Sequence, residues 1–234
     1  MRSKPDLSPN AVTRMVSAPQ YEAQAQNMVE TQLRTRGIRD QRVLEAMRRV
    51  PRHEFVPAAM LGAAYDDRPL AIGEHETISQ PYIVAAMTQA TSVAAGDKAL
   101  EVGAGSGYQA AILGQMGAIV YAVEINPRLA AGARDRLARL GYASVEVVAG
   151  DGSEGLPDYA PYDVIVVSAA APEISPVLLG QLAEGGRLVA PVGNLRYQEL
   201  LLLSKQGGRI SSRYLDACQF VPLIGKGGWH GVRD

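Results

Sequence analysis

The chain has 234 residues, of which 47% are hydrophobic and 20% charged, and its formal net charge at pH 7 is −1. These values are typical of a soluble globular protein with a full core, and the near-zero charge gives no global field that favours nucleic acid or an anionic membrane. The single cysteine, Cys218, excludes an internal disulfide, and no apolar run approaches the ~20 residues that a membrane-spanning helix needs.

The N-terminal quarter is predicted to be helical. Residues 1–20 lack the apolar core of a secretory signal, so we expect a poorly ordered leader and a cytoplasmic protein. From Tyr21 an apolar face predicts a helix that stops at Gly37, and a second helix is expected after Asp40, a good N-cap, ending before Pro51. The residues expected to face inward are Tyr21, Ala25, Met28, Val29 and Leu33 in the first helix and Val43, Leu44, Met47 and Val50 in the second.

Seven arginines lie between Arg34 and Arg52. They could form a phosphate-binding stripe, but acids are interleaved with them, and this favours a solvated helix face.

The stretch "ETISQPY" (76–82) precedes another apolar helical pattern. Proline favours the first helical position, so the helix should begin at Pro81 with Gln80 as its N-cap. Ser79 then lies one residue outside the cap.

From Lys98 onward, short apolar strands alternate with helical patterns. The strands are expected at 98–102, 118–124, 144–152, 162–170, 187–193, 198–205 and 212–225, and the helices at 103–117, 126–141 and 176–186. This alternation predicts an α/β fold: a doubly wound, mostly parallel, seven-stranded sheet with an N-terminal helical cap. We expect one domain over 21–234, divided into a cap with an active-site loop (21–97), a ligand-binding core (98–195) and C-terminal strands (196–234). The order and direction of the last two strands stay open.

Three features fall at the carboxyl ends of successive strands, where doubly wound sheets bind their ligands. The first is "EVGAGSG" (101–107), with glycines at Gly103, Gly105 and Gly107, and the second is Glu124, which could accept hydrogen bonds from both hydroxyls of a ribose. The third is Asp151 beside Gly152, where a carboxylate could accept from an adenine amine. Each alone could be a tight turn, a solvated acid or an Asx turn. Together they predict a ligand that contains adenosine.

The glycine spacing distinguishes between adenosine ligands. A dinucleotide fingerprint has its third glycine five residues after the first, but here that position is Tyr108 and the glycine comes one residue early. "EVGAGSG" instead resembles motif I of the class I S-adenosylmethionine (AdoMet) methyltransferases, which have a Rossmann-like fold. The resemblance implies that Glu101 and the three glycines cradle the methionine end, that Glu124 holds the ribose, and that Asp151 with Gly152 meets the adenine.

The chain offers no evident general base for an amine or phenol acceptor. The strand at 162–170 ends in small residues, the three histidines are scattered, and His75 is best interpreted as a loop residue. A carboxylate acceptor explains this, because with a pKa near ~4 it is already ionised at pH 7.

At this point the chain closely resembles the protein-L-isoaspartate O-methyltransferase family. The matching stretches are 28–57, 64–88, 99–113, 150–174, 185–193 and 220–225, and "ETISQPY" and "AAAPEI" (169–174) are its most specific strings. Departures are Ala104, Ser168 and the glycine-rich tail 226–234.

The resemblance implies methylation of the free α-carboxylate of L-isoaspartyl residues in damaged proteins and peptides. AdoMet is then the donor, S-adenosylhomocysteine the product, and the ester closes to a succinimide that hydrolyses partly to aspartate. By the same resemblance Ser79 is the active-site serine and Thr77 and Ile78 line the cofactor side. A serine hydroxyl can orient a carboxylate without acting as a base. We expect no metal, no nucleic-acid or membrane partner, and a monomer.

Three alternatives stay open at this stage. One keeps the fold and cofactor but assigns a dedicated peptide or small-molecule carboxylate as acceptor. Another is a non-catalytic AdoMet-binding regulator, and the last is an NAD-dependent oxidoreductase, which the glycine spacing disfavours.

Overall fold

The computed structural model describes residues 19–229, so most of the expected leader and the end of the tail (230–234) lie outside the described part. Helix α2 (Pro19–Met28) continues through a π-helical turn (Val29–Leu33) and a 3₁₀ turn (Arg34–Arg36) to Gly37, whose φ of 94° ends it. Helix α3 (Gln41–Arg49) begins at Asp40, whose side chain accepts a hydrogen bond from the Arg42 N–H. Both predicted helices are confirmed.

The prediction for the arginine stripe is right for six residues and wrong for one. Arg36, Arg39, Arg42, Arg48 and Arg49 are exposed and Arg34 is half-buried, as a solvated helix face requires. Arg52, however, is 0% exposed. It follows Pro51 in a separate 3₁₀ turn (Arg52–Phe55), so the change of backbone direction at the proline turns its side chain into the protein.

A small antiparallel hairpin, which the sequence pattern did not reveal, precedes the third helix. It consists of β1 (Leu70–Gly73) and β2 (Glu76–Ile78). Its turn is made by Glu74 (φ 53°) and His75 (φ 63°), non-glycine residues in the left-handed region that usually signals glycine or asparagine. Helix α4 (Pro81–Thr91) then begins with Gln80 as N-cap, as predicted.

The main sheet has seven strands in the order β5-β4-β3-β6-β7-β8-β9. Strands β3, β4, β5, β6 and β7 pair in parallel, while β8 and β9 are antiparallel, which resolves the direction that the sequence left open. The strands are β3 (Lys98–Val102), β4 (Ile119–Glu124), β5 (Val145–Ala149), β6 (Tyr162–Val167), β7 (Leu182–Gly193), β8 (Gln198–Gln206) and β9 (Arg209–Cys218). The helices between them are α5 (Tyr108–Gln115), α6 (Pro127–Arg139) and α7 (Pro176–Gly180). The predicted doubly wound α/β fold is confirmed.

Two predicted elements end much earlier in the structure than the sequence pattern indicated. The helix expected at 176–186 ends at Gly180, because Leu182 already pairs with Tyr162 in the sheet and is buried. A register irregularity between this pair and Val164–Arg187 absorbs the intervening residues, including Gly185 with its φ of 78°. The strand expected at 212–225 ends at Cys218, and beyond it isolated bridges join Pro222 to Ala170 and Ile224 to Trp229.

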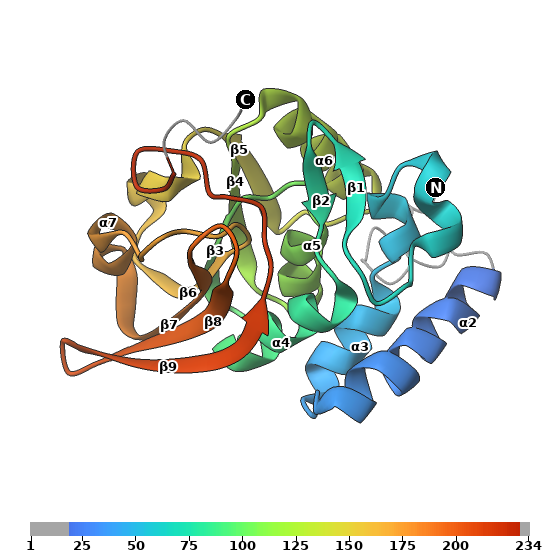
Figure 1. Cartoon of the computed structure of the whole chain (residues 1–234), viewed down its shortest axis with the longest axis horizontal. Coiled ribbons are helices and arrows are strands. Elements are labelled where there is room, and N and C mark those ends of the chain that lie inside the picture. The colour runs from blue at the N-terminus through green and yellow to red at the C-terminus, as the bar shows by residue number, and fades with distance from the viewer. Residues whose placement is uncertain (1–18, 230–234) are drawn as a thin grey trace, which may run out of the picture.

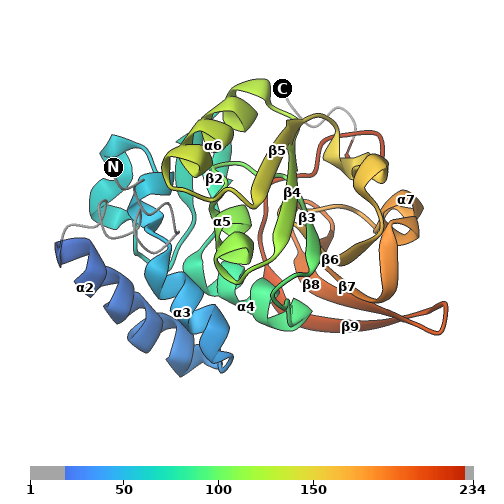
Figure 2. The ribbon, with the colours of Figure 1, turned by 180° about the vertical axis from the view of Figure 1, so that it is seen from behind.

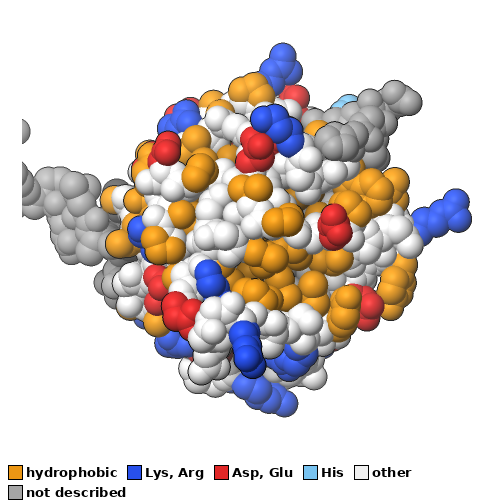
Figure 3. Space-filling view, turned by 90° about the vertical axis from the view of Figure 1, so that its left-hand side faces the viewer, with side chains coloured by type: hydrophobic (Ala, Val, Ile, Leu, Met, Phe, Trp, Pro, Cys, Tyr) orange, Lys and Arg blue, Asp and Glu red, His pale blue; other side chains and the backbone are white. Residues whose placement is uncertain are grey.

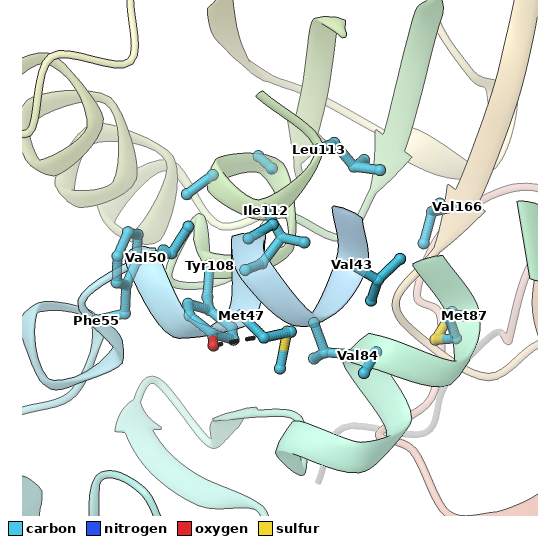
Figure 4. Close-up of a cluster of buried hydrophobic side chains, with 14 of the residues drawn as sticks. Val43, Met47, Val50, Phe55, Val84, Met87, Tyr108, Ile112, Leu113 and Val166 are labelled. Atoms are coloured by element: carbon cyan, nitrogen blue, oxygen red, sulfur yellow. Dashed lines mark hydrogen bonds between the residues drawn. The ribbon is translucent and has the colours of Figure 1, made fainter. Parts of the chain in front are cut away.

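The two faces of the sheet are covered unequally (Figures 1 and 2). Helices α4, α5 and α6 pack on one face, and α3 packs in turn on α4 and α5. Figure 4 shows the resulting core, in which Met47 of α3 meets Tyr108 of α5 and Val84 of α4. Short α7 and the C-terminal segment contribute to a smaller cluster on the other face, which includes Leu178 and Leu223.

The surface over α7 and the C-terminal segment carries apolar side chains in its middle and most of its charged residues toward the margins (Figure 3). Val177 of α7 and Leu195 and Tyr197 of the β7–β8 turn are among the exposed large apolar residues. Within residues 19–229, no helix has the length and apolar character needed to cross a bilayer.

Candidate active site

A cleft of two adjoining hollows lies where β3, β4 and β6 reach their carboxyl ends, as expected for a doubly wound sheet. The first hollow encloses about 510 Å³, including its open mouth, and the second about 380 Å³. They share Thr77, Gly103, Gly105 and Ser168. Of the predicted site residues, the cleft brings together Thr77, Ile78, Ser79, Glu101, Gly103, Gly105, Glu124 and Gly152. Gly107 and Asp151 do not line it.

The glycine loop is shaped by Glu124. The carboxylate at the end of β4 accepts one hydrogen bond from the Gly105 N–H (2.8 Å) and one from the Asn126 N–H (2.9 Å). Gly105 has a φ of 52°, which glycine adopts without the strain a side chain would bring. Gly107 has a packing role, because a Cβ there would lie 3.0 Å from Leu137 of α6. The loop is therefore held open toward the ligand by a carboxylate with lone pairs left for further donors.

Glu101 is a buried carboxyl group with one oxygen unpaired. It is 1% exposed, and its Oε1 accepts from the Ser168 hydroxyl at 3.2 Å. Its Oε2 has no hydrogen-bond partner among residues 19–229. Burial raises the pKa of Glu101 well above its ordinary value, the negative charge of Glu124 adds to this, and the Ser168 hydroxyl opposes it. A carboxyl group that lines a cleft and has one buried oxygen without a partner fits a cationic ligand group, such as the ammonium of AdoMet.

Asp151 is engaged with its own turn and with the C-terminal segment. Its Oδ1 accepts from the Ser153 N–H (3.0 Å) and hydroxyl (2.6 Å), and its Oδ2 accepts from the Lys226 N–H (2.9 Å). Burial alone would raise the pKa of Asp151, but these hydrogen bonds outweigh it and lower the pKa. The Asx turn that the sequence left open is thus present, and the adenine role of Asp151 stays a prediction. Its neighbour Gly152 does line the first hollow.

The segment Thr77–Ser79 closes the cleft from the side of the hairpin. The hairpin tip is anchored to α6, because Glu74 accepts from Asn126 Nδ2 (3.2 Å) and Arg128 Nη1 (3.3 Å). Figure 1 shows β1 and β2 beside α6. Ser79 lines the second hollow together with Glu101, and it reaches this place because β2 ends at Ile78 and α4 begins only at Pro81.

Two contributions to the cleft were not foreseen. Gln109 lines the second hollow, is 6% exposed, and is oriented by its Nε2, which donates to Thr88 Oγ1 at 3.0 Å. The sequence does contain a signal for Gln109, because it is a polar residue in the first turn of a mostly apolar helix, directly after the glycine loop. Residues 221–224 line the first hollow, and no local pattern indicates that a C-terminal segment returns to the sheet edge there.

The described residues contain no group of three or more histidine, cysteine or acidic side chains that could hold a metal ion. His75 is exposed in the hairpin turn, in agreement with its interpretation as a loop residue.

Comparison with known proteins gives one consistent family. Residues 23–228 match the model of the protein-L-isoaspartate(D-aspartate) O-methyltransferase family. A protein-L-isoaspartate O-methyltransferase of Methanoculleus marisnigri is 55% identical over 206 residues, which are 88% of this chain and 94% of that protein. Another, from Koribacter versatilis, is 51% identical over 233 residues and covers both chains fully.

Solved structures of similar fold carry the same family name. A protein-L-isoaspartate O-methyltransferase superposes with a TM-score of 0.78 at 30% identity, over 87% of this chain and 66% of that chain. A putative Plasmodium falciparum protein-L-isoaspartate O-methyltransferase in complex with S-adenosyl-L-homocysteine gives a TM-score of 0.74 at 24% identity, over 87% and 98% of the two chains. At that identity the second likeness shows the fold alone.

Proposed function

Because the chain belongs to the protein-L-isoaspartate(D-aspartate) O-methyltransferase family, we propose that it methylates the free α-carboxylate of L-isoaspartyl residues in damaged proteins and peptides. AdoMet is the methyl donor and S-adenosylhomocysteine the product. The methyl ester then closes to a succinimide by attack of the neighbouring amide nitrogen, with loss of methanol, and hydrolysis of the ring returns part of the material to normal aspartate.

The transfer is an in-line displacement. AdoMet supplies an electrophilic methyl group on a sulfonium. One carboxylate oxygen forms the new O–CH₃ bond as the S–CH₃ bond breaks, and the bonding electron pair stays on sulfur. No proton moves, so the residues of the cleft need to align and desolvate the two reactants rather than supply a base.

We assign the two hollows to two parts of this task. Glu124 and Gly152 line the first hollow, and we propose that it holds the adenosine, with Glu124 on the ribose hydroxyls. Glu101 lines the second hollow, where its unpaired oxygen would receive the ammonium of the methionine end. Gly103 and Gly105 line both hollows, and Thr77 and Ile78 cover the cofactor from the hairpin side.

The observation that carries the proposal is that Ser79 and Glu101 share one hollow. A hydroxyl there can donate to one oxygen of the substrate carboxylate and leave the other directed at the methyl group. Since the carboxylate is ionised at neutral pH, a serine without an adjacent base is sufficient.

The direct test is methyl transfer to an isoaspartyl peptide beside its aspartyl twin of the same sequence, with radiolabelled AdoMet as donor. We expect label in the isoaspartyl peptide only, and its slow release as methanol when the succinimide forms. Equal labelling of both peptides, or of neither, would contradict the proposal. Labelling of a free small carboxylate in preference to either peptide would support the dedicated-acceptor alternative.

The same proposal covers the domain organisation, the oligomeric state and the location of the enzyme. Residues 21–234 act as one domain with the divisions given above, since the helices before Lys98 share with the sheet the larger apolar core, which Figure 4 shows in part. The enzyme acts as a monomer, because a damaged protein must reach the cleft. It works in the cytoplasm, where proteins age in contact with AdoMet.

A further inference from the structure

Arg52 is a buried cation that binds the backbone of the loop between β2 and α4, which contains Ser79. It is 0% exposed, its Nη2 donates to the Ser79 carbonyl at 2.7 Å, and its Nε donates to the Ala64 carbonyl at 2.8 Å. These two carbonyls belong to segments 15 residues apart (79 − 64) in the chain. The fork of the guanidinium therefore joins the loop before α4 to the turn before the hairpin.

Joining two loops through a buried guanidinium costs desolvation free energy. No salt bridge joins Arg52 to an acid among residues 19–229, and its Nη1 has no hydrogen-bond partner there. Burial lowers its pKa, which reflects the cost of keeping the charge out of water. Apolar residues of similar volume commonly stabilise a core as well as buried charges do or better. The buried Arg52 is therefore better explained by the fixed geometry of the two loops that it joins than by a gain in the stability of the fold.

The guanidinium is also fixed from the side of the cofactor loop. It lies over the ring of Tyr108, 4.8 Å from the centroid, and Tyr108 packs edge-on against Phe55 at 5.3 Å. Figure 4 shows these two rings together beneath α5. The guanidinium of Arg136 of α6 lies over the Phe55 ring, 5.9 Å from its centroid, and its Nη1 donates to the Ser106 carbonyl of the glycine loop at 2.8 Å. A continuous row thus runs from the backbone of Ser106 to the backbone of Ser79.

We propose that Arg52 is a positioning residue for methyl transfer: its guanidinium lies over the Tyr108 ring and binds the carbonyl of Ser79, and it thereby fixes the Ser79 hydroxyl relative to the methyl donor. Arg52 does not line the cleft, so it acts through Ser79 and not on the ligands. This inference rests on the proposed function, because it assigns the hydroxyl to the substrate carboxylate.

The test begins with Arg52→Lys, which keeps the charge but loses the planar fork that reaches both carbonyls. We expect AdoMet affinity to stay as in the wild type and kcat for an isoaspartyl peptide to fall about ten- to a hundredfold, the scale for a small misplacement of a catalytic group. Arg134→Lys is the matched control, since the Arg134 fork also holds a backbone carbonyl, that of Val147, away from Ser79. It should keep full kcat.

A double-mutant cycle with Ser79→Ala separates positioning from general support of the fold. If Arg52 acts through the Ser79 hydroxyl, Arg52→Lys causes no further loss of kcat once that hydroxyl is gone. If Arg52 only supports the fold, the losses multiply in the double variant. AdoMet affinity and the midpoint of thermal unfolding are measured for all four proteins.

Three outcomes would overturn the proposal: wild-type kcat in Arg52→Lys, multiplying losses in the cycle, or a failure of Arg52→Lys to fold. The wild-type protein keeps this test distinct from that of the proposed function. If it does not methylate the isoaspartyl peptide, the function is wrong; if it does and Arg52→Lys is equally active, only the positioning role is wrong.

Discussion

Ser79 has the freedom that a ligand-binding hydroxyl needs. Helix α4 begins with Gln80 as N-cap and without a side-chain cap. The Ser79 hydroxyl therefore does not accept a hydrogen bond from the unpaired N–H groups at the start of the helix. Its backbone carbonyl is held by Arg52, and Ser79 lines the same hollow as Glu101. A fixed backbone with an uncommitted hydroxyl suits a residue that orients a substrate.

We therefore expect Ser79→Ala to bind AdoMet as the wild type does and to lose about a hundredfold in kcat, the effect of removing one preorganised hydrogen-bond donor. Calorimetry gives the affinity and single-turnover labelling gives the rate. Ser211→Ala, on the exposed face of β9, is the control and should behave as wild type. A collapse of AdoMet affinity with turnover per bound cofactor preserved would make Ser79 a cofactor-binding residue instead.

The raised pKa of Glu101 should make both the stability of the free protein and its AdoMet affinity depend on pH. Its pKa in the free protein is raised by burial, so the free protein binds this proton more tightly than the unfolded chain does. The stability it contributes is present below the ordinary pKa of a glutamate and declines as pH rises toward the raised folded-state value. A cationic ligand favours the ionised form, so AdoMet binding should release the proton.

The expected result is AdoMet affinity that increases as the pH rises above the ordinary pKa of a glutamate, with proton release on binding. Calorimetry in buffers of different ionisation enthalpy measures that release. Glu101→Gln should bind AdoMet weakly, without this pH dependence. Without ligand near neutral pH, it should be more stable than the wild type, because burying a neutral amide avoids the desolvation that raises the pKa of Glu101. A wild-type affinity that is flat with pH would contradict the assignment.

At the scale of elements, the N-terminus of α6 connects the hairpin, Glu124, for which we propose ribose binding, and the helix itself. The Asn126 side-chain oxygen caps α6 by accepting from Arg128 and Leu129 N–H groups, while its Nδ2 donates to Glu74 at the hairpin tip. Its own backbone N–H binds Glu124. One residue therefore holds three parts of the cofactor side together.

Asn126→Ala should lower the free energy of unfolding by about 1 kcal/mol through loss of the cap and should also weaken AdoMet binding by freeing the hairpin tip. Asn126→Ser separates the two effects, because serine is a good N-cap but lacks the amide that reaches Glu74. We expect it to keep the stability and show only the weaker binding, measured by urea unfolding and calorimetry. Equal stability of the alanine variant and the wild type would exclude the capping role.

Elements were predictable from sequence where local chemistry determines them. Asp40, Asn126 and the Gln80–Pro81 pair mark helix starts through caps and a fixed proline φ, and the structure places the helices there. Leu182 was misassigned because its place in β7 depends on pairing with a strand about 20 residues earlier. The hairpin was missed because its turn uses Glu74 and His75 in place of the expected glycine or asparagine.

The site was predictable to the extent that it lies at strand ends. Glu101, Glu124 and the glycines were found because each follows or ends an apolar strand, and the cleft does contain all of them but Gly107. Arg52 was read as part of a solvated stripe because nothing in its neighbourhood in the sequence indicates the distant carbonyl of Ser79. Contacts that depend on tertiary packing leave no local signature.

At the scale of the whole molecule, the C-terminal segment lies over the first hollow of the cleft, to which we assigned the adenosine. Residues 221–224 line the first hollow, and Trp229 Nε1 donates to the Ala170 carbonyl at 3.0 Å. The Lys226 N–H binds Asp151 at the end of β5. Asp151 thus joins the C-terminal segment to Gly152, which lines the first hollow, and we expect it to couple the fold of that segment to AdoMet binding.

Gly225 is where this coupling can be broken. It has a φ of 151°, and a Cβ there would lie 2.7 Å from Asp151 Cγ, so Gly225→Ala forces the segment away from Asp151. We expect about tenfold weaker AdoMet binding, the equivalent of about 1.4 kcal/mol, with a lower midpoint of thermal unfolding. Gly208→Ala is the matched control, because Gly208 also has a positive φ (71°) but nothing lies within 4 Å of an added Cβ. It should lose some stability through backbone strain and bind AdoMet normally. Equal affinities in the two variants would show that the C-terminal segment is not coupled to the cofactor site.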